Sequence, residues 1–286
     1  PMTPDMQFRI GSVTKTFTSM AILRLVDRLS LDPAARLSRY VANPDPSRYP
    51  DWGDITLEHL AHHTSGIVDN YPGGGLSHSS SYVPAELIQY GKQVNIAGAH
   101  YQYANTNYVL LGMVIEKANP GTYHDFITSE FLNAIPLSKT VVPTSGSNPP
   151  LVCHGFRGQD DVTLEDPSWA AAAGEMVSNV TDLTTWIRTI CQPGSLSPQG
   201  HLLLLSSSGL SGVTEYGLQE FGGWLGHTGE IDGYSCACFY LPSAEASIVV
   251  MVNRSDAAEQ RDVLLLNDVV DAFFPANPTG LPSPKL

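Results

Sequence analysis

The chain has 286 residues, of which 42% are hydrophobic and only 15% are charged, a composition typical of a well-packed globular protein and not of a disordered one. The formal net charge of -13 argues against binding to nucleic acids or to anionic membranes, because both would repel the chain. No apolar run approaches the roughly 20 residues that a membrane helix needs. We therefore expect a globular protein without a transmembrane segment and with no nucleic-acid partner; the composition leaves its oligomeric state open.

The first half of the sequence is predicted to be mainly helical. Apolar residues recur at helical spacing over 12–29, and segment 104–118 continues helically until Pro120. The Gly- and Ser-rich stretch 67–83 is expected to form a surface loop. The other helices expected, in chain order, are 56–62, 123–134, 181–191 and 257–274.

The second half changes to the periodicity of strands. Segments 214–220, 234–241 and 246–253 are predicted strands, separated by turn signals. A helix follows them directly, and the Pro-rich segment 275–286 is expected to be a loose tail. The fold class that follows is α/β (α+β), an antiparallel sheet flanked by helices with an added all-α lobe.

This order of elements predicts a single domain over 1–286. The all-α lobe is expected within about 33–180, and the α/β part is expected to combine 1–32 with 181–274.

Ser12 and Lys15 lie three residues apart at the start of the first predicted helix. A serine there is usually only a helix cap. A lysine at this spacing changes that interpretation if it is buried on the same face, because desolvation then favours its neutral amine, which can take the proton of the serine. The pair is therefore a candidate for a nucleophile and its base.

Two further motifs could complete a site. Tyr103 and Asn105 precede the helix 104–118, where a buried tyrosine can relay protons and an asparagine can hold a substrate amide. His227, Thr228 and Gly229 are expected at the end of an edge-like strand, where the glycine would let a substrate approach the backbone.

The residue after this third motif is Glu230. Its backbone N–H could pair with that of Ser12 as an oxyanion hole.

In this order and at these separations, the three motifs resemble those of the serine β-lactamase and penicillin-binding protein superfamily. The likeness is to class C β-lactamases and, most of all, to the branch that holds D-alanyl-D-alanine carboxypeptidases, D-aminopeptidases and β-lactamase-like esterases. The segments that carry it are 8–32, 55–67, 101–117, 170–187 and 226–236.

The resemblance implies a β-lactamase/transpeptidase-like fold and a serine hydrolase that acts through an acyl-enzyme on a small-molecule or peptide substrate. Ser12 would be the acylated nucleophile, Lys15 and Tyr103 would share the proton transfers, and which of the two is the base stays open. Asn105 would bind the substrate amide, and residues 227–230 would form the strand that borders the substrate site. No cofactor and no metal is expected.

The substrate class is narrowed by one departure from the carboxypeptidase pattern. Glu230 stands where those enzymes place a hydroxyl, and no Arg or Lys lies between Arg188 and Arg254. A substrate carboxylate would therefore meet like charge. We expect carboxylic esters or D-amino-acid-containing peptides and amides as substrates.

Several alternatives remain at this point. D-alanyl-D-alanine carboxypeptidase and β-lactamase are the other enzymatic interpretations, and a non-catalytic relative that binds peptidoglycan or a protein is the alternative of another class.

A second departure concerns the N-terminal part of the fold. Only eleven residues precede Ser12, whereas the family normally places a helix and strands there. We expect these elements to be missing from this chain, and we expect a secreted or periplasmic location, with a cytoplasmic one left open.

The remaining candidates are cysteines and histidines. Cys153 and Cys191 could form a disulfide, whereas Cys236 and Cys238 lie on one face of a strand, where a bond is unfavourable. The histidines of segment 59–63 match a structural turn of the family better than a metal site.

Overall fold

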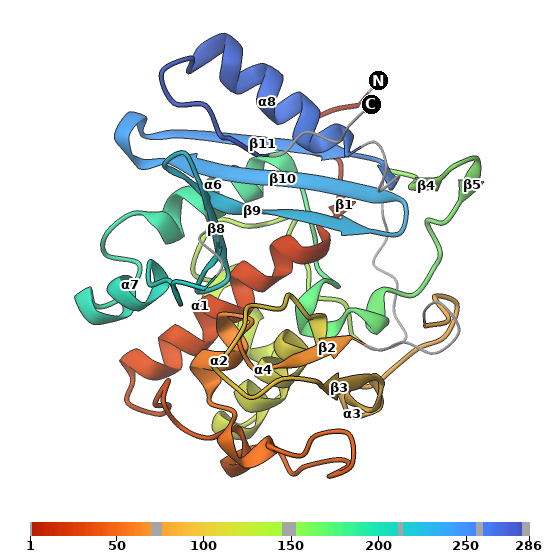
Figure 1. The fold of residues 1–286 in the computed structure, drawn as a ribbon. Coiled ribbons are helices and arrows are strands. Elements are labelled where there is room, and N and C mark those ends of the chain that lie inside the picture. The colour runs from red at the N-terminus through yellow and green to blue at the C-terminus, as the bar shows by residue number, and fades with distance from the viewer. Residues whose placement is uncertain (1, 70–75, 145–152, 211–213, 256–259, 282–286) are drawn as a thin grey trace.

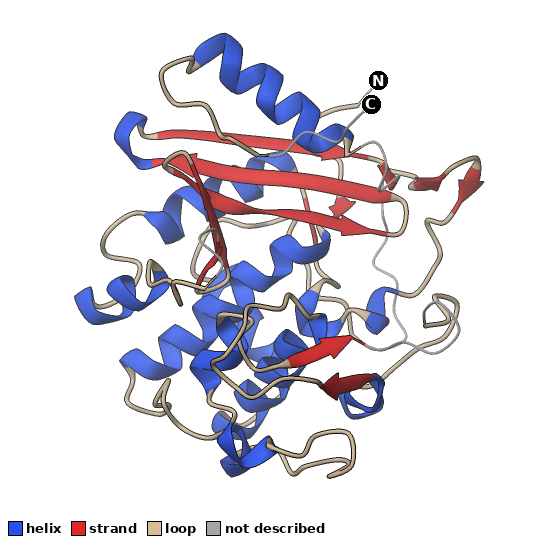
Figure 2. Ribbon diagram, in the orientation of Figure 1, coloured by secondary structure: helices blue, strands red, loops and turns tan. Residues whose placement is uncertain are grey.

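The computed structural model describes residues 2–69, 76–144, 153–210, 214–255 and 260–281. A five-stranded antiparallel sheet lies between helices, with a helical layer below it (Figures 1 and 2). The strand order is β11–β10–β9–β8–β7. The bounds are β7 (Thr214–Glu215), β8 (Leu218–Phe221), β9 (Trp224–Ile231), β10 (Tyr234–Leu241) and β11 (Ala246–Val252).

Helices cover both faces of this sheet. Helix α8 lies on one face, and α1 and α6 lie on the other (Figure 1). The helices are α1 (Thr14–Asp27), α2 (Leu57–Ala61), α3 (Pro84–Leu87), α4 (Asn105–Ala118), α5 (Tyr123–Ile127), α6 (Val180–Cys191), α7 (Pro198–Leu204) and α8 (Arg261–Phe273).

The central strand β10 explains why the sheet needs cover on both sides. Its side chains alternate between two apolar clusters, because successive residues of a strand point to opposite faces. Cys236, Cys238 and Tyr240 face the main core, and Ala237, Phe239 and Leu241 face α8. Every residue of the strand is buried as a result.

Shorter strands connect the sheet to the helical layer. β1 (Phe8–Arg9) pairs with β6 (Val177–Ser178), and β2 (Ile67–Asp69) pairs with β3 (Gly91–Gln93). A third small sheet holds β12 (Arg254–Ser255), β4 (Phe156–Arg157) and β5 (Asp160–Asp161).

The predicted α/β fold class is confirmed, and five of the six predicted helices correspond closely to observed ones. The sixth, 123–134, is α5 followed by a π-helical turn at Thr128–Leu132. The first part of the last predicted helix, 257–259, lies outside the described residues. Helix α7 was not predicted.

Three predictions need correction. Segment 214–220 is two strands, β7 and β8, because the turn at Gly217 has a φ of +75°, which interrupts an extended chain. Segment 67–83 begins with β2 before it becomes a loop. Part of the expected loose tail is packed, since Leu281 is buried against α8 and the carbonyl of Asn277 accepts a hydrogen bond from the Trp224 indole.

The described residues hold four free cysteines, so the Cys153–Cys191 disulfide that the sequence left open is not formed. In the same part of the chain, we find no helix whose length and apolarity would suffice to cross a bilayer.

Candidate active site

Ser12 lies in a 3-10 turn, Gly11–Val13, that leads directly into α1. The turn is held close to the sheet by two glycines. A Cβ at Gly11, whose φ is +50°, would lie 2.6 Å from the backbone nitrogen of Glu230 in β9. A Cβ at Gly229 would lie 2.0 Å from the carbonyl oxygen of Ile10. Only glycine at both positions lets the two backbones come this close.

Lys15 lies in the first turn of α1, three residues after Ser12, and is fully buried. Its Nζ donates hydrogen bonds of 2.8 Å each to the Oγ of Ser12, to the Oδ1 of Asn105 and to the carbonyl of Ala173. Burial lowers the pKa of Lys15 to about 7, against a partial opposing effect of the Asp69 carboxylate. The amine is therefore poised to exchange a proton near neutral pH.

Tyr103 approaches the serine from the other side. Its hydroxyl donates a 2.8 Å hydrogen bond to the Oγ of Ser12, and the Nζ of Lys15 lies 4.8 Å from the centre of its ring. Burial raises the pKa of Tyr103 above its ordinary value, so the phenol keeps its proton. His63 stacks on the same ring with a centroid separation of 4.3 Å.

His63 is itself neutral and buried in this arrangement. Its Nδ1 accepts a hydrogen bond of 3.2 Å from the backbone N–H of Ala104, and burial together with the positive charge of Lys15 lowers its pKa well below the ordinary value. The neutral His63 ring therefore packs against the Tyr103 ring and restricts its position.

Helix α4 begins at the site, and its N-terminus is capped by a residue that the sequence analysis did not identify. The carboxylate of Asp69, at the end of β2, accepts hydrogen bonds from the backbone N–H groups of Asn105 and Thr106, at 2.8 and 3.0 Å. A carboxylate at a helix N-terminus is stabilised by the helix dipole. The cap fixes the position of Asn105, which contacts Lys15.

The third motif lies in the middle of β9, which corrects the prediction of a strand end. Strand β9 pairs with β8 and β10, so the motif is on an inner strand. Burial lowers the pKa of His227 to about 3, so its ring is neutral, and its Nδ1 contacts the carbonyl of Thr228. The backbone N–H of Thr228 donates to the side chain of Gln219, at 3.2 Å.

Glu230 is exposed at the end of this motif. Glu220 on β8 faces elsewhere, since its carboxylate accepts a hydrogen bond from the N–H of Gly223 in the following turn.

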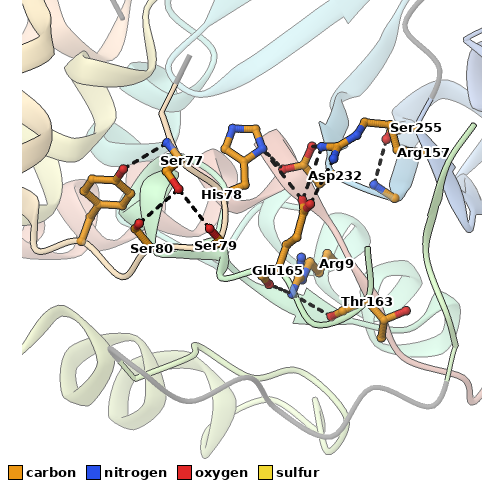
Figure 3. A network of polar contacts seen from close by, with 12 residues as sticks. Arg9, Ser77, His78, Ser79, Ser80, Arg157, Thr163, Glu165, Asp232 and Ser255 are labelled. Carbon is orange, nitrogen blue, oxygen red and sulfur yellow. Dashed lines mark hydrogen bonds and ion pairs between the residues drawn. The ribbon is translucent and has the colours of Figure 1, made fainter. Parts of the chain in front are cut away.

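A polar network supports the turn between β9 and β10 (Figure 3). Arg157 forms ion pairs with Glu165, at 3.0 Å, and with Asp232, at 2.9 Å, and His78 contacts Asp232 as well. The ligand-type atoms of His78, Glu165 and Asp232 lie within 4.8 Å of one another. The Arg157 guanidinium already neutralises both carboxylates, so the network is better explained as an anchor for the turn than as a metal site.

A second arginine, Arg9, lies beside this network. The guanidinium of Arg9, on the strand before Ser12, donates to the backbone carbonyls of Thr163 and Glu165 (Figure 3).

The structure therefore brings the predicted residues together. Ser12, Lys15, Tyr103 and Asn105 form one hydrogen-bonded group, and His227 lies beside Tyr103 with ring centres 6.4 Å apart. Gly229 and Glu230 adjoin the Ser12 turn through their backbones, whereas Thr228 contacts Gln219.

Comparisons with known proteins agree with this arrangement. The family model described as Beta-lactamase matches residues 1–271. The chain is similar to a D-stereospecific amidohydrolase from Streptomyces sp., with 25% identity, 95% of this chain and 87% of that one covered, and a TM-score of 0.80.

A D-amino acid amidase from Ochrobactrum anthropi has the same fold, with 21% identity, coverage of 96% and 86%, and a TM-score of 0.81. Protein flp of Staphylococcus aureus is 26% identical over 87% of this chain and 53% of its own length. The chain thus spans about half the length of the curated relative it matches here. It belongs to the β-lactamase family, within the serine β-lactamase/transpeptidase superfamily of serine hydrolases.

Proposed function

We propose that the protein hydrolyses amides or short peptides of D-amino acids through an acyl-enzyme on Ser12. The observation that carries this proposal is the position of the Ser12 Oγ, 2.8 Å from both the Lys15 Nζ and the Tyr103 hydroxyl. A nucleophile needs a base within this distance and a second group that can return the proton.

The pKa values favour Lys15 as the base. An amine whose burial lowers its pKa to about 7 is partly neutral at neutral pH and can accept the Ser12 proton as Oγ bonds to the substrate carbonyl carbon. Tyr103 keeps its proton because burial raises its pKa. It would relay the proton taken up by Lys15 to the leaving amine when the C–N bond breaks, which returns Lys15 to its neutral form.

Water would then attack the ester carbonyl of the acyl-enzyme. A neutral Lys15 would take one proton from that water and return it to the Oγ of Ser12 as the ester C–O bond breaks, which regenerates the free enzyme.

The oxyanion of each tetrahedral intermediate would accept hydrogen bonds from the backbone N–H groups of Ser12 and Glu230. The close packing of the Ser12 turn on β9 supports this assignment, because a Cβ at Gly229 would lie only 3.1 Å from the nitrogen of Ser12. Asn105 is the candidate for holding the substrate amide, since its Oδ1 already faces Lys15.

The acidic surroundings support a substrate with a free amine. Glu230 is exposed beside the third motif, the neighbouring side chain on β8 is the neutral Gln219, and Asp69 lies at the start of α4. A substrate carboxylate would be repelled there, and an ammonium group would be attracted. The D-configuration is taken from the two amidases named above. Simple esters are the second candidate, because they also lack a carboxylate.

The test compares wild type with Ser12→Ala on D-phenylalaninamide, L-phenylalaninamide and p-nitrophenyl butyrate. We expect the wild type to prefer the D-amide and the variant to retain less than about 1% of its activity, because loss of a covalent nucleophile costs several orders of magnitude. Ser47→Ala, at an exposed serine in a loop, is the matched control.

Residual turnover above that level would remove Ser12 as nucleophile. A wild-type protein that neither turns over these substrates nor forms a covalent adduct on Ser12 would instead favour a non-catalytic binding protein.

A further inference from the structure

A cavity of about 210 Å³ lies in the helical layer, behind the site described above. Helices α4 and α5 form two of its walls, and a 3-10 turn, Ala171–Ala173, forms a third. Its lining is mainly apolar, with Val109, Val142 and Ala172 as examples. This volume exceeds the roughly 150 Å³ at which an apolar protein cavity accepts benzene, so a ring with a short substituent would fit.

Glu175 is the unexplained residue of this cavity. It is half-buried, and no hydrogen bond or ion pair of its carboxyl group is formed with any residue that the structure describes. Burial, reinforced by Asp166 and Glu116, raises the pKa of Glu175 to about 8. A carboxyl group in this position gains from a cationic partner that the neighbouring residues do not supply.

The other polar groups around the cavity have partners. The Glu116 carboxylate accepts a hydrogen bond of 2.9 Å from the backbone N–H of Tyr123, and the tyrosine hydroxyl bonds with Thr18 at 2.7 Å. His124 uses its Nδ1 on the carbonyl of Val142, at 2.8 Å. Among these lining groups, Glu175 is the carboxyl group that accepts no hydrogen bond from a residue that the structure describes.

The Ala171–Ala173 turn separates this cavity from the Ser12 site. On the far side of the turn, the carbonyl of Ala172 accepts from Thr18 at 2.7 Å and the carbonyl of Ala173 accepts from Lys15 at 2.8 Å. On the near side, Ala171 and Ala172 line the cavity. Ala171 adopts a φ of +41°, a conformation that costs energy for a residue with a Cβ.

We propose that this cavity is a second binding site, for a primary ammonium ion with a small apolar body, and that Glu175 is its ionic partner. The apolar walls would enclose the body of the ligand, and the carboxylate would accept hydrogen bonds from the ammonium group. The site is distinct from that of Ser12, and the proposal does not depend on the proposed function.

Binding would change the protonation of the protein in a defined way. Below the pKa of Glu175, the carboxyl group is neutral in the empty cavity, and pairing with an ammonium ion requires it to ionise. The proton leaves to solvent, and the ligand keeps its own. Binding at pH 7 should therefore release close to one proton per ligand bound.

The experiment is isothermal titration calorimetry of the chain with benzylammonium chloride at pH 7, in two buffers of different ionisation enthalpy. Benzyl alcohol, which has the same shape without the charge, is the second probe. We expect benzylammonium to bind at one site, at least about tenfold more tightly than the alcohol, with proton release. Equal affinities for the two probes would overturn the proposal.

Two variants locate the site. Glu175→Gln should abolish both the preference for benzylammonium and the proton release, and Val83→Trp, at an exposed residue of the lining, should obstruct binding of both probes. Glu245→Gln removes an exposed carboxylate elsewhere and should change nothing. Unchanged binding to both cavity variants would mean that the ammonium ion binds elsewhere, and the proposal would fail. The Val83 variant decides the matter if Glu175→Gln does not fold.

Discussion

The pKa of Lys15 depends on its buried surroundings and not on its spacing from Ser12 in the sequence. A lysine at this position of an exposed helix would stay protonated, with a pKa near its ordinary value of about 10.4. Here three oxygen atoms receive its N–H groups, and the surrounding protein excludes water. These hydrogen bonds partly replace the water that the Lys15 amine loses on burial. The loss of hydration still favours the neutral amine over the ammonium ion.

The pH dependence of turnover follows from this pKa. In the proposed mechanism neutral Lys15 is the active form, so kcat/KM should fall about tenfold per pH unit below an apparent pKa of about 7 and level off above it. Rates measured from pH 5 to 9 with an uncharged ester give the profile. Lys15→Arg should be inactive, because a guanidinium does not deprotonate, whereas Lys117→Arg, at an exposed lysine of α4, should behave as wild type. A flat profile across pH 7 would rule out Lys15 as the base.

Glu230 is the residue expected to select against carboxylates. Replacing it with threonine removes a negative charge beside the third motif, so acylation by benzylpenicillin should become roughly tenfold faster, equivalent to about 1.4 kcal/mol. Intact-mass spectrometry of the Ser12 adduct over time measures this rate. Glu220→Thr is the control, since the Glu220 carboxylate accepts a hydrogen bond from Gly223 in the turn that follows β8. An unchanged rate would show that repulsion by Glu230 does not limit the substrate range.

At the scale of single elements, α1 is a helix without a solvent-facing side over most of its length. Its buried hydroxyl groups are matched by partners: Thr16 accepts from the Trp186 indole at 2.8 Å, and Ser19 pairs with the Tyr108 hydroxyl at 3.1 Å. Phe17 stacks on the same Trp186 at 3.8 Å. Such a helix is held by packing on every side, which keeps Ser12 and Lys15 in a fixed relation.

Helix α4 depends on its cap in the same way. Asp69→Ala should lower the free energy of unfolding by about 1–2 kcal/mol, because two N–H groups at the start of the helix lose their acceptor. It should also lower kcat about ten- to a hundredfold, because Asn105 moves away from Lys15.

Chemical denaturation and steady-state kinetics measure the two effects of this substitution. Ser197→Ala, which removes the side-chain cap of α7 away from the site, should lose stability without losing kcat. A full-rate Asp69→Ala enzyme would show that the cap has no role in positioning.

At the scale of the whole molecule, the sheet is stabilised by its two covered faces and not by covalent links. The buried clusters on either side of β10 supply the apolar contacts. All four cysteines are buried thiols within these cores and beside them, and burial raises the pKa of Cys191 to about 12, which makes it unreactive.

The melting temperature should therefore not respond to reducing agents. A Cys153–Cys191 disulfide would contribute roughly 3–4 kcal/mol, which a reductant would remove with a clear drop in melting temperature. Calorimetry with and without reductant tests this, and a thiol titration in denaturant should count four free cysteines. A count of two would restore the disulfide.

The sequence by itself indicated the residues of the candidate site and determined the types of most elements. Helix 104–118 has a strong apolar period and a proline just beyond its end, and Ser12 with Lys15 and Tyr103 with Asn105 are local patterns that a reader can find without coordinates. Their roles came from a resemblance, because spacing alone does not distinguish a helix cap from a nucleophile.

Only the tertiary structure decided the contacts between distant parts of the chain. Asp69 caps α4 although it lies 36 residues before Asn105 in the sequence, and the carbonyl of Ala173 accepts a hydrogen bond from Lys15, which lies 158 residues earlier. No local sequence pattern indicates either contact. The same holds for the central position of β9, which depends on pairing, and for Glu175, whose pKa depends on which apolar residues surround it. Periodicity describes one element at a time, whereas burial and hydrogen bonding at this site arise where several elements meet.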